Sequence, residues 1–522
     1  MNICLIKPPR LENYGHLGMS PAPSLGLAYI AAALEAAGHK VSVIDCIGEA
    51  PSQYRYFKPG GHSLAGHENL ATRGLNEEEV AERIPKNTQI LGFSCMFTNN
   101  WLAARNLINY LRPYFPTALF MGGGEHASAV AEYCLRQSEL DVIVMGEGEE
   151  TVVELVSHYE KGEALEQVTG ICLKKGNHGF YKTPRRERAT ELEQIVRPAW
   201  HLFPVENYAK YNLVWSAAGE PSLPMTATRG CPYSCTFCSN PDMWGTRYYM
   251  RSPRHVADEM EYLKNTFGIL NFDFYDLTAI IKKEWIIDFC KELTRRNLNV
   301  SWQIPAGTRS EAIDREVAYW LALSGCKNIA YAPESGSPRM LKLIKKKVNL
   351  NNMLRSINDS YKENLNVMLN MIIGFPDEQH TDVWKTIGFL AKCGWAGANT
   401  IALSIYQPYA GSALFKRLTD ENRIQPEEND YYLKQTYIDT FFKMEWYNTN
   451  INRKVYFIYW LLCYSVFYTV SFAKCPFRIF RVLGNIANSN YESRFEKQVG
   501  GMIRNISKNL RPIPDAAASK RS

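Results

Sequence analysis

The sequence predicts an α/β protein in which two parallel sheets are followed by a helical C-terminal region. Short apolar segments alternate with helical stretches in two parts of the chain, which indicates strands that helices bury on both faces. The composition, 46% hydrophobic and 21% charged, is that of a folded globular protein. We expect a doubly wound sheet in residues 1–160, a linker with a hairpin in 161–220, a (β/α) barrel in 221–410 and helices in 411–522.

The first region repeats strand–helix units. Open parallel sheets of this kind bind ligands beyond the carboxyl ends of their strands. Residues 49–75, rich in Gly, Pro, His and Tyr, interrupt the pattern and predict a long loop near that edge. Strands are expected at 3–6, 41–45, 90–95, 118–121 and 142–145, and helices at 23–37 and 101–111.

Glycine-rich turns follow two of these strands. One turn begins with Gly122 and Gly123, and the other contains Gly146, Glu147 and Gly148. Glycine lets the backbone approach a large flat ligand closely. An ordinary nucleotide-binding module is weakened as an interpretation, because the sequence has no Gly-x-Gly-x-x-Gly after the first strand and no Walker lysine.

The barrel region repeats the same units after the predicted hairpin at 170–173 and 179–182. Active sites of such barrels collect at the carboxyl ends of the strands, so polar residues there are candidates. Asp273 and Asp276 close the second strand and Glu334 closes the fourth. Each of these carboxylates, like Glu311 beyond the third strand, could instead cap a helix or form a surface ion pair. Further candidates surround the third strand: Ser301, Gln303, Thr308, Arg309 and Glu311. Barrel strands are expected at 223–229, 269–275, 300–304, 329–332 and 367–373, and helices at 254–267, 283–295 and 313–324.

The loop after the first barrel strand carries Cys231, Cys235 and Cys238 in a Cys-x3-Cys-x2-Cys array. Thiolates at this spacing can converge on one polynuclear centre, as in iron–sulfur clusters, and three ligands would leave a fourth iron open. Zinc is the alternative, but structural zinc sites use four ligands, and the sequence has no second Cys-x2-Cys or His pair. A disulfide fits less well, because nothing marks the chain as secreted.

At these residues the chain resembles the radical SAM superfamily, whose signature adds an aromatic residue before the third cysteine, here Phe237. The resemblance implies the partial six-unit form of the barrel and a [4Fe–4S] cluster on the three cysteines. It also implies S-adenosylmethionine (SAM) on the open iron, with reductive cleavage to a 5′-deoxyadenosyl radical. An electron donor such as flavodoxin or ferredoxin would then be a partner. The usual Gly-Gly-Glu motif is not legible after the second strand, where residues 272–278 stand in its place. The SAM contacts that the resemblance to this superfamily implies are Phe237, Asp276, Glu334 and Gly374.

Segments 24–34, 121–128 and 141–151 resemble the cobalamin-binding domain found before many radical SAM domains. The Asp-x-His-x-x-Gly signature, whose histidine coordinates cobalt from below, is absent. The resemblance therefore implies a base-off corrinoid without a protein ligand on its lower face. His126 could face the corrinoid or be an ordinary histidine at a helix start. The cobalamin contacts that the resemblance implies are Gly122, Gly123, His126, Gly146, Glu147 and Gly148.

Together the two resemblances imply a cobalamin-dependent radical SAM enzyme that methylates an unactivated carbon. Two alternatives stay open. One is radical cyclisation or rearrangement without methyl transfer, as in the resembling anaerobic porphyrin ring cyclases. The other is a corrinoid or iron–sulfur sensor that catalyses nothing, against which the many polar strand ends argue. The sequence does not identify the substrate.

The C-terminal region contains an uncharged run, residues 455–473, in which eight residues are aromatic. As a helix it would extend roughly 28 Å, close to the hydrocarbon thickness of a bilayer. Residues 474–522 hold ten Lys and Arg against three Asp and Glu, a net charge of 10 − 3 = +7. We expect a cytoplasmic protein in which residues 453–481 contact a membrane or a lipid-like substrate. The alternative is a buried helix with a solvated basic tail, and no recognisable module points to nucleic acid.

Overall fold

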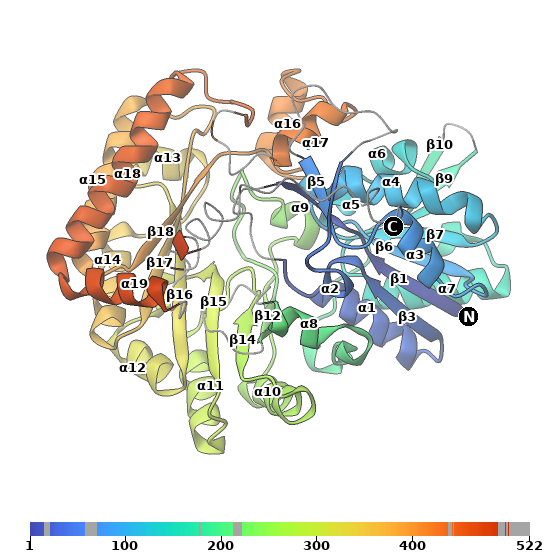
Figure 1. Ribbon diagram of the computed structural model, residues 1–522, viewed down its shortest axis with the longest axis horizontal. Helices are drawn as coiled ribbons and strands as arrows, with labels where there is room; N and C mark the ends of the chain where they lie inside the picture. The colour runs from blue at the N-terminus through green and yellow to red at the C-terminus, as the bar shows by residue number, and fades with distance from the viewer. Residues whose placement is uncertain are drawn as a thin grey trace, which may run out of the picture.

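Two β-sheets, one mainly and one wholly parallel, lie side by side and pack against helices, and the predicted α/β class is confirmed (Figure 1). The computed structural model describes residues 1–14, 21–57, 70–176, 179–211, 222–436, 441, 443–488, 496 and 499–500. The N-terminal sheet occupies the right side of the view, and the second sheet, with α18 Arg453–Lys474 and α19 Phe477–Ala487, occupies the left side.

The N-terminal sheet has seven strands in the order β10-β9-β8-β7-β6-β1-β3, and β3, β1, β6, β7 and β8 run parallel. The chain adds β3 on one side of β1 and all later strands on the other side. A topological switch point therefore lies between β1 and β6, where doubly wound sheets bind ligands. The parallel strands are β1 Asn2–Lys7, β3 Lys40–Asp45, β6 Ile90–Ser94, β7 Leu119–Gly123 and β8 Val142–Val144.

Helices cover both faces of this sheet because its strands are apolar on both sides. Ile3 and Leu5 of β1 belong to one buried cluster, and Cys4 and Ile6 belong to another. This alternation is the period of two that a strand imposes on its side chains. The first cluster includes side chains of α1 Leu25–Ala36 and α7 Glu149–Lys161, and the second includes side chains of α3 Glu77–Arg83, α4 Trp101–Leu111 and α6 Ala131–Gln137.

Two predictions for this region need correction. The hairpin formed by β9 Ile171–Lys175 and β10 Gly179–Lys182 is not a separate linker, because β9 pairs antiparallel with β8 and extends the sheet. The predicted loop 49–75 contains β4 Tyr54–Tyr56 and β5 Leu70–Arg73. β5 pairs antiparallel with β4 on one side and with β2 Arg10–Asn13 on the other, in a small three-stranded sheet. Residues 58–69 of that loop lie outside the described residues.

The linker to the second sheet packs on the first one. In α8 Val205–Lys210, Tyr208 donates a hydrogen bond of 2.6 Å to Asp45 at the carboxyl end of β3. Asn207 donates one of 2.9 Å to the carbonyl of Gly48 in α2 Cys46–Glu49. The linker therefore covers the carboxyl end of β3.

The second sheet has six parallel strands in sequence order, β11-β14-β15-β16-β17-β18, as expected for a partial (β/α) barrel. All five strands predicted one by one are present, and the sequence analysis did not single out the sixth, β18. The strands are β11 Ser222–Met225, β14 Asn271–Phe274, β15 Ser301–Thr308, β16 Cys326–Glu334, β17 Asn366–Ile373 and β18 Thr400–Ile405. The helices between them are α10 Pro253–Phe267, α11 Lys283–Arg296, α12 Arg315–Leu323, α13 Pro338–Leu343, α14 Leu350–Lys362 and α15 His380–Ala396.

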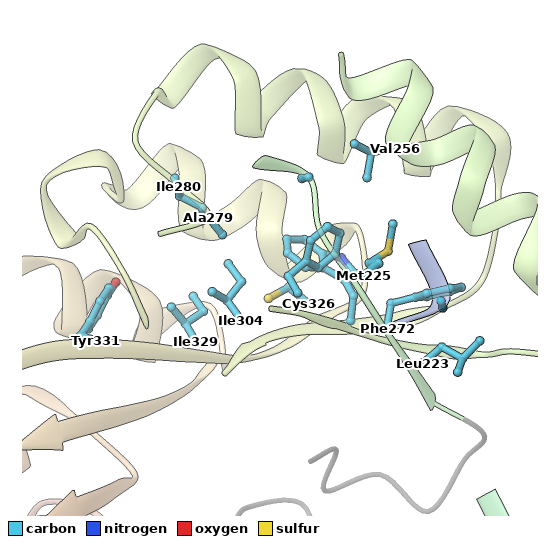
Figure 2. Close-up of a cluster of buried hydrophobic side chains, with 14 of the residues drawn as sticks. Leu223, Met225, Val256, Phe272, Ala279, Ile280, Ile304, Cys326, Ile329 and Tyr331 are labelled. Atoms are coloured by element: carbon cyan, nitrogen blue, oxygen red, sulfur yellow. The ribbon is translucent and has the colours of Figure 1, made fainter. Parts of the chain in front are cut away.

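Figure 2 shows how side chains from neighbouring barrel strands pack together beneath the helices. Met225 and Phe272 come from the first two strands and Ile304 from the third, and Val256 reaches them from α10. All four are at most 1% exposed. Such close packing leaves little freedom to the strands, so the loops at their carboxyl ends start from fixed positions.

The C-terminal region is helical, with α16 Ala413–Asp420, α17 Asn429–Thr436, α18 Arg453–Lys474 and α19 Phe477–Ala487. α18 packs on α15, where a Cβ on Gly394 would lie only 3.0 Å from the carbonyl oxygen of Phe467. α18 also lies along the last strand, because the amide of Leu403 donates to Tyr464 and Tyr468 donates to Thr400, each at 3.4 Å. One face of α18 is therefore buried, as the buried-helix alternative expected. Its buried residues are Tyr456, Tyr459, Cys463, Phe467 and Ser471.

α18 is also the one helix among the described residues that is long and apolar enough to cross a bilayer. Only 28% of its most apolar 18-residue stretch is buried. Its outer face mixes apolar residues, such as the exposed Ile458 and Leu461, with the exposed polar residues Ser465 and Thr469.

Candidate functional site

The cysteine loop is held at both ends by a short antiparallel pair, β12 Thr228–Arg229 and β13 Tyr249–Met250. Gly230 opens the loop with φ +88°, and a Cβ there would lie 2.1 Å from the carbonyl oxygen of Arg247. Only glycine fits this position. The loop follows β11 directly, so it stands at the carboxyl end of the barrel sheet, where active sites of this fold collect.

The three cysteines of the loop differ from most others in the chain. Nine of the thirteen cysteines are buried, whereas Cys231, Cys235, Cys238 and Cys475 are half-buried, and all thirteen are free thiols. Burial raises the pKa values of Cys231 and Cys235, and it raises the pKa of Cys238 to about 12. Without a bound cation these thiols are therefore neutral. A metal centre would supply the positive charge that deprotonates them.

Among the described residues, no group of three or more His, Cys, Asp or Glu side chains is close enough to hold a single metal ion. The zinc alternative would need four ligands around one atom. A [4Fe–4S] cluster binds each thiolate through a different iron, so its ligands do not converge on one point. Three half-buried thiols on one loop, with no fourth cysteine, fit such a cluster with one open iron.

Two cations lie near these thiols. Lys346 and Arg309 both lower the pKa values of Cys231 and Cys235, against the larger effect of burial. Arg309 is stacked on the ring of Tyr233 within the loop, 4.4 Å from its centre. Positive charge at this position would offset the negative charge of thiolate ligands.

Glu334 ends β16 close to the same loop. Its carboxylate lies 3.0 Å from Lys346 Nζ, and the two side chains are 8% and 16% exposed. Burial raises the pKa of Glu334, and Lys346 opposes that shift. The backbone of Glu334 has φ +65°, a left-handed conformation that is uncommon for residues other than glycine. Such strain is often found at functional sites, which supports the candidate.

Phe237 and Gly374 are also brought to this end of the barrel. The ring of Phe237 meets Phe375 edge to face, with ring centres 5.8 Å apart. Gly374 has φ +83° and donates its N–H to Glu378 Oε2 at 2.6 Å. Tyr456 of α18 donates to the same oxygen at 2.7 Å. Because this N–H is already used, a contact of Gly374 with SAM would have to involve other atoms of its backbone.

Asp276 lies just beyond the second barrel strand, as expected, and its carboxylate turns toward the segment before the cysteine loop. Its carboxylate accepts hydrogen bonds from the amides of Ala227 and Thr228 and from the Thr228 hydroxyl. It is 1% exposed, and burial raises its pKa to about 6. Asp276 thus holds the segment between β11 and β12, which leads into the cysteine loop, and its contact with SAM stays a prediction.

The third barrel strand corrects two further candidates. Ser301 and Gln303 lie in the first half of β15, far from its carboxyl end, and Gln303 donates to Asp273 at 2.6 Å inside the sheet. Thr308 is the last residue of that strand. Glu311 accepts the amide of Asn349 and pairs with Arg309, which matches the surface ion pair named as its alternative.

The predicted cobalamin glycines fall into two kinds. A Cβ on Gly146, which has φ +79°, would meet nothing within 4 Å, and one on Gly123 would come no closer than 3.6 Å to another atom. A Cβ on Gly122 would lie 2.8 Å from Leu140, and one on Gly148 would lie 2.7 Å from Ile30. Gly123 and Gly146 therefore leave room for a ligand, whereas Gly122 and Gly148 allow close packing inside the protein.

Glu147 connects the second glycine turn to the linker and the barrel. Its carboxylate pairs with Arg188 at 3.2 Å, accepts the amide of Ala189 at 3.0 Å and lies 3.6 Å from Arg229. The next carboxylate, Glu149, lies 2.6 Å from Arg229. Arg229 ends β12, so these ion pairs tie the turn to the start of the cysteine loop.

His126 does not lie at the open edge of the sheet. Its side chain is 2% exposed and packs against Trp101 and Tyr432, with ring centres 5.6 and 5.7 Å away. Its Nδ1 is 3.1 Å from Thr98 Oγ1, and burial lowers its pKa to about 3. A buried neutral histidine within α5 Glu125–Ala129 matches the ordinary alternative.

The residue before it, Glu125, makes a contact with the cysteine loop that sequence reasoning missed. Its carboxylate accepts a hydrogen bond from the hydroxyl of Ser239, which follows Cys238 directly. Burial raises the pKa of Glu125, and this hydrogen bond opposes the shift. The carboxyl ends of the two parallel sheets therefore meet at the cysteine loop.

Two apolar residues at the switch point were also missed. Met96 and Phe97 follow β6 and are 41% and 59% exposed. A Cβ on Gly124, the residue before Glu125, would lie 3.0 Å from the Cα of Met96. Exposed apolar side chains at a ligand-binding edge can cover the face of a flat cofactor. Their place directly after a predicted strand is the sequence signal that could have identified them.

Comparison with known proteins agrees with this geometry. The family model described as "B12 binding domain" matches residues 19–156, and the one described as "Radical SAM superfamily" matches residues 225–390. The first match includes both glycine turns, and the second includes the cysteine loop and β14 to β17.

Several curated proteins are similar over most of the chain. An uncharacterized methyltransferase of Pyrococcus horikoshii is 27% identical over 88% of this chain and 93% of its own length. The cytidylyl-2-hydroxyethylphosphonate methyltransferase of Streptomyces wedmorensis is 28% identical over 78% of this chain and 80% of its own length. The anaerobic magnesium-protoporphyrin IX monomethyl ester cyclase of Cereibacter sphaeroides is 26% identical over 70% of this chain and 59% of its own length.

A solved structure shares the arrangement of both sheets. The radical S-adenosylmethionine methyltransferase TsrM of Kitasatospora setae, with tryptophan substrate and a SAM analog bound, matches with a TM-score of 0.60. The match covers 80% of this chain and 76% of TsrM at 17% identity, and at that identity it supports the fold alone.

Proposed function

The chain belongs to the radical SAM superfamily, in the class that carries an N-terminal B12-binding domain, and we propose that it methylates an unactivated carbon of a small molecule. The cofactors of these two domains are a [4Fe–4S] cluster, SAM and cobalamin. The observation that carries the proposal is the hydrogen bond between Ser239 and Glu125, which joins the cysteine loop to the first glycine turn. Two cofactor sites held together in this way can act on one substrate.

We propose that Cys231, Cys235 and Cys238 hold the cluster, with Lys346 and Arg309 offsetting its negative charge. When bound, the cluster and SAM would supply the 5′-deoxyadenosyl radical, and cobalamin would supply the methyl group. Phe237, Glu334 and Gly374 line the same end of the barrel and are the proposed SAM contacts. Asp276 would act on this site indirectly, because it fixes the segment that leads into the cysteine loop.

For cobalamin we propose that Gly123 and Gly146 face the corrin ring, since both leave open space. Gly122, Gly148 and Glu147 would instead keep the two turns in shape. The buried ring of His126 supports a base-off cobalamin without a histidine below the cobalt.

Two other functions remain to be distinguished by experiment. The methyltransferase relatives match over 93% and 80% of their own lengths and the cyclase over 59%, which favours methyl transfer over cyclisation. A sensor without turnover is disfavoured, because the barrel end gathers a nearly buried carboxylate and a nearly buried ammonium, Glu334 and Lys346, beside the cysteines.

The test needs no knowledge of the substrate. The anaerobically reconstituted protein, loaded with cobalamin and reduced, is given SAM labelled in its methyl group. We expect release of 5′-deoxyadenosine and retention of labelled methyl groups by the loaded protein. Release without any retained label would contradict methyl transfer and leave the cyclase function. Absence of both would contradict the enzyme and favour the sensor.

We propose a small molecule as the substrate class. We further propose an electron donor such as flavodoxin or ferredoxin, which the half-buried position of the three cysteines would allow to approach. We also propose a cytoplasmic location with peripheral membrane contact through residues 453–481. The packing of α18 on the barrel supports contact from the surface of the membrane over a helix that crosses it.

A further inference from the structure

The last described helix, α19, turns an apolar face outward. Phe477 and Phe480 are 84% and 72% exposed, and they are the two most exposed large hydrophobic side chains described. Leu483 is 59% exposed. These three residues are spaced by three, so they share one face of the helix. A soluble protein rarely leaves such a continuous apolar face to water without a function for it.

The orientation of α19 is fixed by the opposite side of the helix. Arg478 is 8% exposed, and its guanidinium donates to the carbonyls of Ala398 and Gly397 and to the hydroxyl of Ser471. Rotating α19 to bury its phenylalanines would pull this charged group away from all three acceptors. Leaving the buried guanidinium charge without these partners is costly, so the apolar face stays outward.

The junction between α18 and α19 keeps the two helices at an angle (Figure 1). Pro476 stands between them and has no backbone N–H, so it cannot continue α18. α19 lies on the side of the barrel away from the N-terminal sheet. The apolar face is therefore separate from the cysteine loop.

The surroundings of this face are aromatic and basic. Trp395 of α15 is 60% exposed, and Lys474 at the end of α18 lies 5.1 Å from the centre of its ring. Tryptophan prefers the interface between lipid and water. From Lys474 to the end of the chain there are ten Lys and Arg and three Asp and Glu. An apolar helix face close to Lys474, in a stretch of sequence with an excess of positive charge, is complementary to a surface of anionic lipids.

We propose that α19 lies in the headgroup region of an anionic membrane and that Phe477, Phe480 and Leu483 insert between the lipids. α18 stays packed on the barrel and carries α19 at its end. This inference rests on the membrane contact proposed above and makes it specific. It assigns the contact to α19, whereas the sequence pattern pointed mainly to the longer uncharged run in α18.

The test compares the full chain with two double variants that change charge equally. F477E/F480E alters the proposed inserting face. Y114E/Y319E alters two exposed aromatic residues on the N-terminal domain and on α12. Flotation is measured with vesicles of phosphatidylcholine alone and with about 30% phosphatidylglycerol added. We expect binding to the anionic vesicles, a loss of at least about tenfold in partitioning for F477E/F480E and little change for Y114E/Y319E.

A milder variant, F477S/F480S, shows the same loss if lipid insertion is the cause, and circular dichroism checks that each variant is folded. Equal partitioning of F477E/F480E and the unaltered chain would overturn the proposal. So would sedimentation showing a dimer that these substitutions abolish, because the face would then cover a second copy. Stronger binding after removal of residues 489–522 would also overturn it, because the tail would then cover the face.

The radical chemistry is followed in the same samples. Release of 5′-deoxyadenosine in solution is expected to be equal in all variants, because the altered residues lie outside the proposed catalytic site. Failure of the membrane proposal would leave that release intact. Failure of the radical SAM function would abolish the release and leave flotation intact.

Discussion

The guanidinium of Arg229 lies 2.6 Å from the carboxylate of Glu149, and the two side chains are 10% and 17% exposed. Arg229 ends β12, two residues before Cys231, and Glu149 begins α7 after the second glycine turn. Glu147, in that turn, lies 3.6 Å from the same guanidinium. One arginine therefore holds the cobalamin-binding domain against the start of the cysteine loop.

The first prediction concerns this arginine. Arg229→Ala leaves two largely buried carboxylates without their shared cation, so it should destabilise the protein by about 2 to 4 kcal/mol. The measurement is the shift of the thermal unfolding midpoint by calorimetry. Arg295→Ala is the matched control, because Arg295 is 69% exposed in its pair with Glu292. That surface pair should contribute at most about 1 kcal/mol. Equal shifts for the two variants would show that the ion pairs of Arg229 contribute no more to stability than an exposed surface pair does.

The second prediction concerns the three cysteines. Replacing Cys231, Cys235 and Cys238 with Ala should remove bound iron, the visible absorbance of the cluster and all SAM cleavage, because no spare cysteine stands nearby in the sequence. Cys475→Ala is the control, since Cys475 is the one other half-buried cysteine and contacts Tyr361 at 2.9 Å. It should keep full iron content. A triple variant that still binds a cluster after anaerobic reconstitution would refute the assignment.

The third prediction concerns His126. Its imidazole is buried against Trp101 and Tyr432, so His126→Ala should leave the spectrum of bound cobalamin almost unchanged. Loss of a packed ring should still lower stability by about 1 to 3 kcal/mol. His158→Ala, which removes a histidine from α7, is the control. Electron paramagnetic resonance of the reduced, cobalamin-loaded protein gives the answer. Nitrogen splitting that disappears only in the His126 variant would show that the histidine does bind cobalt.

The fourth prediction concerns pH. Burial raises the pKa of Glu378 from 4.5 to about 7, although hydrogen bonds from Tyr456 and Gly374 oppose the shift. Between these two pH values the unfolded chain has lost this proton and the folded chain keeps it. Stability therefore falls as pH rises from about 4.5 to 7, by roughly 3 kcal/mol for this group alone.

Glu378→Gln keeps an acceptor for both donors but has no proton to lose. The difference in stability between this variant and the unaltered chain should grow in favour of the variant as pH rises from about 5 to 7. Denaturant unfolding at several pH values measures this difference. Glu316→Gln on the surface of α12, where Glu316 pairs with Lys283, is the control. A constant difference for Glu378→Gln across the range would mean that its carboxyl group is already ionised at pH 5.

Much of the fold could be predicted because most of the parallel strands are continuous apolar runs, which a short stretch of sequence is enough to recognise. β18, with the sequence Thr-Ile-Ala-Leu-Ser-Ile, mixes polar and apolar residues and was not singled out. β4 and β5 have only three and four residues and stand in a stretch rich in turn-forming residues. The pairing of β5 with β2 is a tertiary contact, which a local pattern does not contain.

The candidate site divides in the same way. The three cysteines lie within eight residues, so their spacing alone pointed to a cluster. The contact of Glu125 with Ser239 joins residues 114 positions apart and has no signal in the sequence. Asp276 was correctly placed near a strand end, but its carboxylate turns back to Thr228, 48 residues earlier. The sequence identifies which groups are available, whereas the direction in which each side chain points depends on the assembled fold.

The position of α18 along β18 has a practical consequence for any shortened form of the protein. β18 is the last strand of an open sheet, and Tyr464 and Tyr468 of α18 contact it directly. A chain ending near residue 450 would expose this strand edge to other molecules and should aggregate through strand-to-strand pairing. Insolubility of such a fragment would say nothing about lipid. Removal of the tail should begin after residue 488, where the edge strand keeps its cover.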